Sequence, residues 1–203
     1  MTTEREVKIV KPGRRPGNQD TRGAILSAAR SAFAARGFAG SSLRMIAADA
    51  GVDAALIHHY FDSKQQLFLA TMQLPAELPQ LVDRVAAGGP VGLGERLVLT
   101  VLELWDSEAQ PALVGALRTA LHEPEVARPV REFLMLEILG RLLRSAQIDP
   151  AEAARRAGLV ASQILGLVVG RYLLRLPALV DRPVAELITE IGATVQRYVD
   201  GRT

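Results

Sequence analysis

Residues 41–67 limit the possible folds of this chain more than any other stretch. They read SSLRMIAADAGVDAALIHHYFDSKQQL, with apolar residues at helical spacing on both sides of a glycine. The first apolar face consists of Leu43, Ile46, Ala47 and Ala50. Ser41 or Ser42 can cap this helix, and Gly51 ends it, because glycine turns through the left-handed backbone region without steric cost.

A second short helix is predicted directly after this turn. Asp53 can cap it, and Ile57 and Phe61 give it a buried face of its own. Two short helices joined by a glycine turn are typical of a helix-turn-helix unit. The second helix of such a unit lies in the major groove of DNA.

The composition favours an all-α protein with a substantial core. The chain has 203 residues, 49% of them hydrophobic, and no cysteine, which fits a cytoplasmic protein better than a secreted one. Its longest apolar stretch, residues 157–170, is shorter than the roughly 20 residues that span a bilayer. We therefore expect no membrane association and no disulfide.

Basic residues are concentrated in the first part of the chain. Residues 1–75 hold ten Lys or Arg and six acids, whereas the remainder holds fourteen and sixteen. A basic front suits a protein that presents this end to phosphates. Residues 1–18 lack helical periodicity and are predicted to form a flexible basic arm, either a solubilising tail or a segment that enters the minor groove.

The remaining chain reads as further helices without a convincing strand. Breaks at Pro75, at the glycines of residues 88–89 and at Asp149-Pro150 separate them, and Asp181 is expected to open the last helix. One further helix is expected from about Pro129 to Ala146. We divide the chain into the arm, a DNA-binding domain over residues 19–63 and a helical body for ligand binding and dimerisation over residues 64–203.

The head closely resembles the TetR family of transcriptional repressors. That family combines an amphipathic helix, Gly-Phe/Tyr, Thr/Ser-x-x-x-Ile-Ala-x-x-Ala-Gly-Val and x-x-x-x-Leu/Ile-Tyr-x-x-Phe-x-x-Lys-x-x-Leu. The matching residues here are Gly37-Phe38, Ser42, Ile46-Ala47, Ala50-Gly51-Val52, Ile57, Tyr60-Phe61, Lys64 and Leu67. The resemblance covers residues 20–70 and implies a homodimer that binds a palindromic operator and releases it when a small-molecule effector binds the body.

The resemblance also implies which residues contact DNA. Those expected to contact bases are Arg44, Ala54, Ala55 and His58, and those expected to contact phosphates are Ser42, His59, Tyr60 and Lys64. Arginine suits the O6/N7 pair of guanine, and alanine methyl groups suit thymine. The family often has tyrosine at the position of His58, so the contact made there is open. For Arg44 a phosphate or surface role, and for Tyr60 a buried ring, remain alternatives.

Small residues recur every four positions in the long helix that follows Asp149-Pro150. They are Gly158, Ser162, Gly166 and Gly170, and their face lets another helix approach closely. The partner is either another helix of the same subunit or, as the TetR resemblance implies, a second copy. In the second case Ile191 and Val195 of the last helix belong to the same dimer interface.

The body helices carry large apolar residues that can line an effector cavity. The candidates are the apolar residues Leu102, Trp105, Phe133 and Leu136 and the polar residues Arg118 and His122. With Arg118, His122 and Arg141 in its wall, this cavity would suit an anionic apolar effector. Each apolar candidate is also compatible with plain core packing.

An enzymatic function has little support in the sequence. The chain contains no glycine-rich phosphate loop and no Gly-x-Ser-x-Gly elbow, and His58 and His59 point about 100° apart on a helix. We expect no metal and no cofactor. The leading interpretation is a sequence-specific transcriptional regulator that acts as a repressor, and the alternative is a helical ligand-binding or scaffolding protein without DNA binding.

Overall fold

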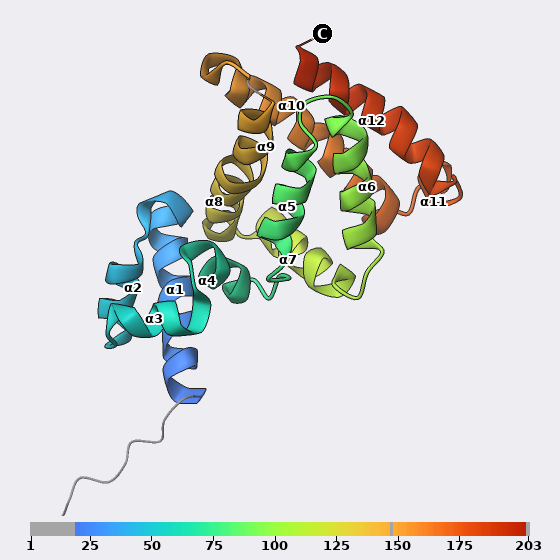
Figure 1. Ribbon diagram of the computed structural model, residues 1–203. Helices are drawn as coiled ribbons and strands as arrows, with labels where there is room; N and C mark the ends of the chain where they lie inside the picture. Colours follow the sequence, from blue (N-terminus) through green and yellow to red (C-terminus); the bar gives the residue numbers. More distant parts are fainter. Residues whose placement is uncertain (1–18, 147, 202–203) are drawn as a thin grey trace, which may run out of the picture.

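The computed structural model describes residues 19–146 and 148–201, and the expected basic arm lies outside them. Over this part of the chain the regular structure is helical, with no strand, as the sequence predicts. Figure 1 shows a small head, formed by the first four helices, at one end of a larger helical body. None of the described helices is long and apolar enough to cross a membrane.

Four helices build the head: α1 (Gln19–Gly40), α2 (Leu43–Ala50), α3 (Ala54–Phe61) and α4 (Lys64–Thr71). Their shared core contains Ile25, Phe33, Phe38, Ile46, Ile57, Phe61, Leu67 and Phe68. Because Leu67 and Phe68 of α4 are part of this core, α4 packs as a head helix although it also leads into the body.

Side-chain caps set the beginnings of the short head helices. Ser42 accepts a hydrogen bond from the backbone N–H of Met45, and Asp53 accepts one from that of Ala55. Ser41 does not cap a helix, because its buried hydroxyl donates to the carbonyl oxygen of Gly37 at 2.8 Å. This hydrogen bond ties the end of α1 to the beginning of α2.

The first half of the body consists of α5 (Leu78–Ala87), α6 (Leu93–Trp105), α7 (Gln110–His122) and a longer rod that ends near the Asp149-Pro150 break. The rod is made of α8 (Pro124–Phe133), the π-helix η1 (Leu134–Leu139) and α9 (Gly140–Ser145). It begins five residues before the expected start at Pro129, which sits inside α8. Pro124 and Glu123 supply the actual helix start.

The second half of the body contains α10 (Pro150–Val168), the π-helix η2 (Val169–Leu173), α11 (Pro177–Val180) and α12 (Val184–Asp200). Asp149 caps α10 through the backbone N–H of Ala151, as expected. The expectation for Asp181 was wrong, because Asp181 follows α11 and Pro183 occupies the cap position of α12. In Figure 1, α12 lies along the side of the body that is remote from the head.

Candidate nucleic-acid interface and internal cavity

The turn between α2 and α3 fixes the helix-turn-helix geometry. Gly51 adopts φ 66° and ψ 32°, the left-handed conformation predicted for it. The N–H of Val52 donates to the carbonyl oxygen of Ala47 at 3.0 Å, which closes the end of α2. Ile46 and Ile57, both fully buried, anchor the two helices in the head core.

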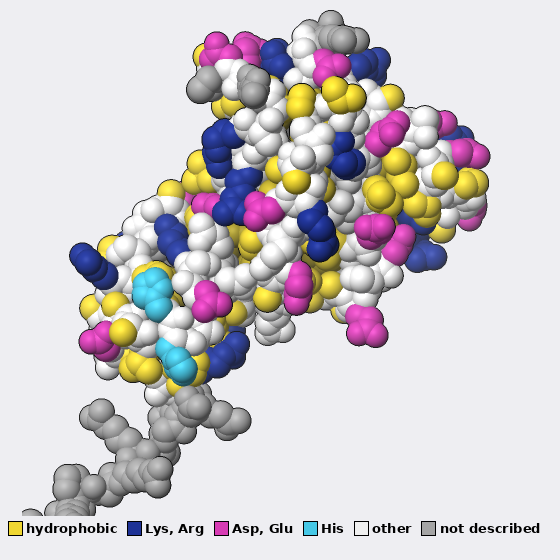
Figure 2. Space-filling view, viewed as in Figure 1, with side chains coloured by type: hydrophobic (Ala, Val, Ile, Leu, Met, Phe, Trp, Pro, Cys, Tyr) yellow, Lys and Arg dark blue, Asp and Glu magenta, His cyan; other side chains and the backbone are white. Residues whose placement is uncertain are grey.

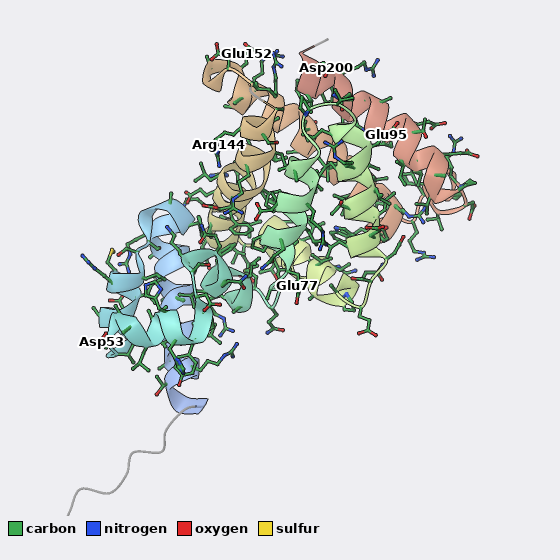
Figure 3. The ribbon with its side chains drawn as sticks, viewed as in Figure 1. Asp53, Glu77, Glu95, Arg144, Glu152 and Asp200 are labelled. Carbon is green, nitrogen blue, oxygen red and sulfur yellow. The ribbon has the colours of Figure 1, made fainter. Side chains whose placement is uncertain are left out.

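The outer surface of α3 carries the residues expected to face DNA bases. Ala55 and His58 are exposed, and Figure 2 shows histidine side chains on the surface of the head. Figure 3 places Asp53 at the edge of the head, where α3 begins. Ala54 differs from this expectation: it is half-buried and packs against the head core, so it offers DNA little surface.

Arg44 lies on the neighbouring helix α2 and is exposed. Its position in the first turn of α2 leaves its long side chain on the outside of the head. The structure therefore brings Arg44, Ala55 and His58 onto two adjacent helices of one helix-turn-helix unit.

Two exposed apolar residues on the same two helices were missed from sequence. Leu56 of α3 is 37% exposed and Met45 of α2 is 38% exposed. Each lies one position away from a fully buried isoleucine, Ile57 or Ile46, and so outside the apolar face of its helix. An apolar residue off the buried face was the signal that could have identified them as candidate contacts to thymine methyl groups.

The four expected phosphate ligands differ in their surroundings. His59 is exposed, with its ring 5.2 Å from that of Tyr60. Tyr60 is half-buried and packs against the head core, which matches the buried ring weighed for it, and its phosphate contact stays a prediction. Ser42 is exposed, and its hydroxyl already accepts from Met45.

Lys64 faces its own subunit. Its Nζ lies 4.5 Å from the centre of the Phe38 ring and 3.5 Å from the carbonyl oxygen of Ala39. Burial lowers the pKa of Lys64, and the carboxylates of Glu137 and Glu132 act in the opposite direction. A DNA phosphate would act in the same direction as these carboxylates, because a nearby anion favours the charged ammonium.

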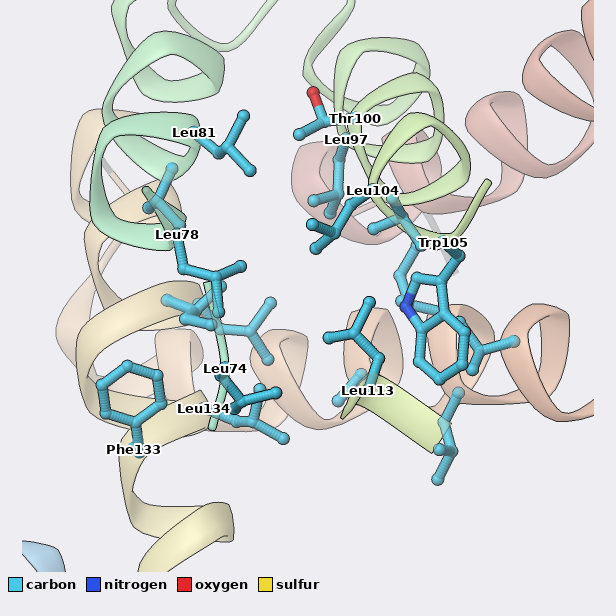
Figure 4. Close-up of a pocket in the computed structure, with 18 of the residues that line it drawn as sticks. Leu74, Leu78, Leu81, Leu97, Thr100, Leu104, Trp105, Leu113, Phe133 and Leu134 are labelled. Carbon is cyan, nitrogen blue, oxygen red and sulfur yellow. The ribbon is translucent and has the colours of Figure 1, made fainter. Parts of the chain in front are cut away.

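An apolar cavity of about 270 Å³ lies inside the body. It is bounded by α5, α6, α7, α10 and the rod formed by α8 and η1. Figure 4 shows Leu78 and Leu81 on one side, Leu97, Leu104 and Trp105 on another, and Phe133 and Leu134 near the head.

Two of the six expected cavity residues, Trp105 and Phe133, line this cavity. The other four do not line it. Leu102 is 1% exposed and belongs to the body core, while Arg118, His122 and Leu136 lie on the outside. The Nδ1 atom of His122 lies 2.8 Å from the carbonyl oxygen of Arg118, an arrangement within one helix.

Arg141 is also absent from the cavity wall. Its guanidinium lies 3.2 Å from Asp83 and 3.9 Å from Glu137. The charged residues expected around an anionic effector therefore point elsewhere.

Phe133 links the cavity to the head. It lines the cavity, yet it packs in the head core, with its ring 5.4 Å from Phe38 and 4.9 Å from Phe68. Phe68 itself lines the cavity from the head side. A movement of the cavity wall at Phe133 would thus act directly on the head core, against which α2 and α3 pack.

The same rod holds the end of α1 by hydrogen bonds. The N–H of Ala39 donates to Oε2 of Glu132 at 2.8 Å, and Arg128 donates to the carbonyl oxygen of Ala34 at 3.1 Å. Gly37, at φ 77° and ψ 174°, lets the chain pass beside the Glu132 carboxylate. We call these two hydrogen bonds, at Ala39 and at Ala34, the clamp. The helix-turn-helix unit begins directly after it.

The small residues of α10 fall into two groups. Gly158, Ser162 and Gly166 are exposed, and an added Cβ at either glycine would meet nothing within 4 Å. Gly170 is buried, and a Cβ there would lie 2.6 Å from Leu179 of the same subunit. The first group is an uncovered face, whereas Gly170 serves packing inside the subunit and was assigned wrongly to the interface.

The two α12 residues of the expected interface differ in exposure. Val195 is 0% exposed in the body core, and Ile191 is half-buried against that core. Assigning Val195 to the dimer interface was therefore wrong, because it has no surface to offer a partner.

A helix-turn-helix head on an all-helical body with an apolar cavity defines a class of DNA-binding regulators. Residues 25–71 match the family of bacterial regulatory proteins described as tetR, and residues 92–199 match the tetracyclin repressor-like C-terminal domain. Each match falls on the corresponding part of the structure.

Individual relatives agree with these matches. The chain is 30% identical over 191 residues to the HTH-type transcriptional regulator BetI of Rhizobium meliloti, covering 89% of this chain and 92% of that protein. It is 34% identical over 165 residues to the BetI of Agrobacterium fabrum, covering 76% and 77%. A TetR-family regulator of Streptomyces coelicolor A3 has a crystal structure that is similar, with 37% identity, a TM-score of 0.46, and coverage of 93% and 99%.

The chain belongs to the tetR family of bacterial transcriptional regulators, as its head motif predicts. It is a DNA-binding regulator with an N-terminal helix-turn-helix and a helical body. Within the described residues, no group of three or more His, Cys, Asp or Glu side chains is arranged to hold a metal ion.

Proposed function

We propose that this protein is a homodimeric repressor that binds a short palindromic operator and leaves it when a small molecule occupies the body cavity. The observation that carries this proposal is the position of Phe133, which lines the cavity and packs against Phe38 and Phe68 in the head core. One residue thus belongs to both the candidate effector site and the support of the DNA-reading helices.

Sequence reading is assigned to Arg44, Ala55 and His58, with Leu56 and Met45 as additional apolar contacts. Their exposure on α2 and α3 supports this assignment. The reading surface has few hydrogen-bonding groups, so thymine methyl groups and DNA shape carry a large share of the discrimination. Phosphate contacts are assigned to Ser42, His59, Tyr60 and Lys64, which fix register without reading sequence.

Selection of binders from random DNA duplexes at physiological salt tests the DNA-binding part. Enrichment of a palindrome with half-sites about one helical turn, or about 34 Å, apart supports the proposal. If no sequence is enriched over bulk DNA, the alternative of a helical ligand-binding or scaffolding protein takes its place.

Variants separate base reading from phosphate binding. Arg44→Ala should change the preferred bases, whereas Lys64→Ala should weaken binding to all sequences and reduce its salt dependence. Arg84→Ala, on the exposed side of α5 in the body, serves as the control for lost positive charge. An unchanged consensus in Arg44→Ala would reassign Arg44 to the DNA backbone.

Dimerisation is assigned to the uncovered face of α10 at Gly158, Ser162 and Gly166. Leu165 beside it is 45% exposed, which gives this face an apolar margin. Gly166→Arg should leave the subunit folded, because Gly166 is exposed and an added Cβ meets no atom of the subunit within 4 Å, but it should produce monomers in light scattering. Gly115→Arg, at an equally open position on α7, is the matched control and should keep the wild-type mass.

Release from DNA is assigned to the rod of α8 and η1. A ligand that displaces Phe133 or Leu134 would move the clamp at Ala39 and Ala34, and with it the spacing of the two heads in the dimer. The ligand's difference in affinity for the two arrangements sets how far DNA binding falls. Phe133→Leu, which keeps an apolar side chain but loses both ring contacts, should bind operator yet respond less to a ligand.

A further inference from the structure

We infer that the cavity takes an uncharged, largely apolar molecule and excludes anions and cations. This inference rests on the proposed role of the cavity as the effector site. Its binding step needs no DNA and can be measured separately.

The cavity wall has almost no polar groups. The side chains around it are aliphatic or aromatic, apart from the hydroxyl of Thr100 and the indole N–H of Trp105. Its lining contains no Asp, Glu, Lys, Arg or His. Figure 4 shows Thr100 near one end of the cavity, beside Leu97 and across from Leu81. At most one or two hydrogen bonds are therefore available to a bound molecule.

The charged groups of neighbouring helices are engaged or turned outward. Arg141 lies beside Asp83 and Glu137, and Arg118 and His122 are exposed on α7. A charged ligand in the cavity would lose its hydration without gaining a counter-charge. That loss costs far more than the burial of an uncharged polar group, so the wall selects against either sign of charge.

The size of the cavity limits the ligand further. Its volume of about 270 Å³ lies just below the roughly 300–1,000 Å³ of pockets that hold drug-sized ligands, so it suits a small molecule. Two lining residues, Leu134 and Leu165, are 42% and 45% exposed on the single subunit. The cavity therefore opens between η1 and α10 through apolar side chains, at the margin of the face that we assign to dimerisation. A small uncharged molecule meets leucine side chains from the opening to the interior.

Two fluorescent probes with the same ring skeleton test the inference on the full-length protein. N-phenyl-1-naphthylamine is uncharged, and 1-anilinonaphthalene-8-sulfonate is the same molecule with a sulfonate. We expect the uncharged probe to bind at least tenfold more tightly. A naphthylmethyl-trimethylammonium cation should compete at least tenfold more weakly than uncharged 1-methylnaphthalene. Equal or tighter binding of either ion would overturn the inference.

Substitutions locate the bound probe. Ala161→Leu on α10 fills part of the cavity and should weaken binding of the uncharged probe at least tenfold, whereas Ala154→Leu, exposed on the same helix, should change it less than twofold. Ala116→Leu on α7 repeats the test from another wall if Ala161→Leu fails to fold. Unchanged binding in a folded cavity variant would place the probe elsewhere and refute the assignment.

The outcomes for ligand and DNA remain distinct. A protein that enriches an operator but binds none of the probes would overturn the inference and leave the DNA-binding proposal standing. A protein that enriches no operator but binds the uncharged probe selectively would refute the DNA-binding proposal and leave the inference on the cavity standing.

Discussion

Substitution of Gly37 by alanine should weaken the head, although it adds only one methyl group. Gly37 adopts φ 77° and ψ 174°, a region that is essentially limited to glycine. An added Cβ would also lie 2.6 and 2.7 Å from the two carboxylate oxygens of Glu132. Alanine therefore meets both a backbone restriction and a steric conflict.

The two effects have different magnitudes. Holding a residue with a side chain in this backbone region costs about 1–3 kcal/mol. Displacing the Glu132 carboxylate would also lose its 2.8 Å hydrogen bond from the N–H of Ala39, worth about 1 kcal/mol at a partly exposed site. We expect Gly37→Ala to lower the free energy of unfolding by about 2–4 kcal/mol.

Urea unfolding followed by circular dichroism measures this loss and separates its parts. Because Glu132→Ala removes the carboxylate, the double variant Gly37→Ala/Glu132→Ala should retain only the backbone cost on top of the Glu132 effect. Gly23→Ala in the same helix, where an added Cβ meets nothing within 4 Å, should stabilise by about 0.5–1 kcal/mol. A Gly37→Ala variant within about 0.5 kcal/mol of wild type would refute the reasoning, since a glycine-only conformation has to cost more.

Three further predictions concern other parts of the molecule. Asp53→Ala removes the cap on the N–H of Ala55 and should lower the free energy of unfolding by about 1 kcal/mol in urea. Burial, together with the hydrogen bond to Asp106, raises the pKa of Tyr172 to about 12. Since the unfolded chain loses this proton first, stability should fall as the pH rises from about 10 to 12, and less steeply in Tyr172→Phe; equal slopes in urea titrations would contradict this. Gly192→Ala places a Cβ 2.8 Å from the Cα of Glu95 and should cost more than about 1 kcal/mol by thermal unfolding, and an unchanged transition would argue against so close a contact.

Local signals made the head largely predictable. The cap residues Ser42 and Asp53 and the turn at Gly51 act within a few residues, so their conformations follow from neighbouring sequence. The family motif further predicted that α2 and α3 pair as one helix-turn-helix unit. What local reasoning overlooked was the off-face exposure of Leu56 and Met45, which the motif does not fix.

The packing of the body was harder to predict, because helical periodicity shows which face of a helix is apolar but not which helix packs against that face. Val195 and Gly170 lie on apolar or small faces, as read from sequence, but those faces pack inside the subunit against the body core and Leu179. Arg118 and His122 were assigned to a cavity wall, whereas both are exposed on α7. Such choices depend on the packing of distant helices, which no local pattern specifies.

The close contact between α6 and α12 bears on where the body can deform. At Gly94, a Cβ would overlap the carbonyl of Gly192 and lie 2.7 Å from the backbone nitrogen of Gln196, so the two backbones touch with no side chain between them. The amide of Gln196 also accepts from the N–H of Gly94 and donates to the carbonyl of Pro90. Sliding one helix along the other would break these hydrogen bonds and bring the two backbones into steric overlap. We therefore expect α6 and α12 to move as one rigid unit. Deformation of the body is then left to the remaining walls of the cavity. Among these walls, α5 and the rod also reach the head, because Leu78 and Phe133 pack in the head core.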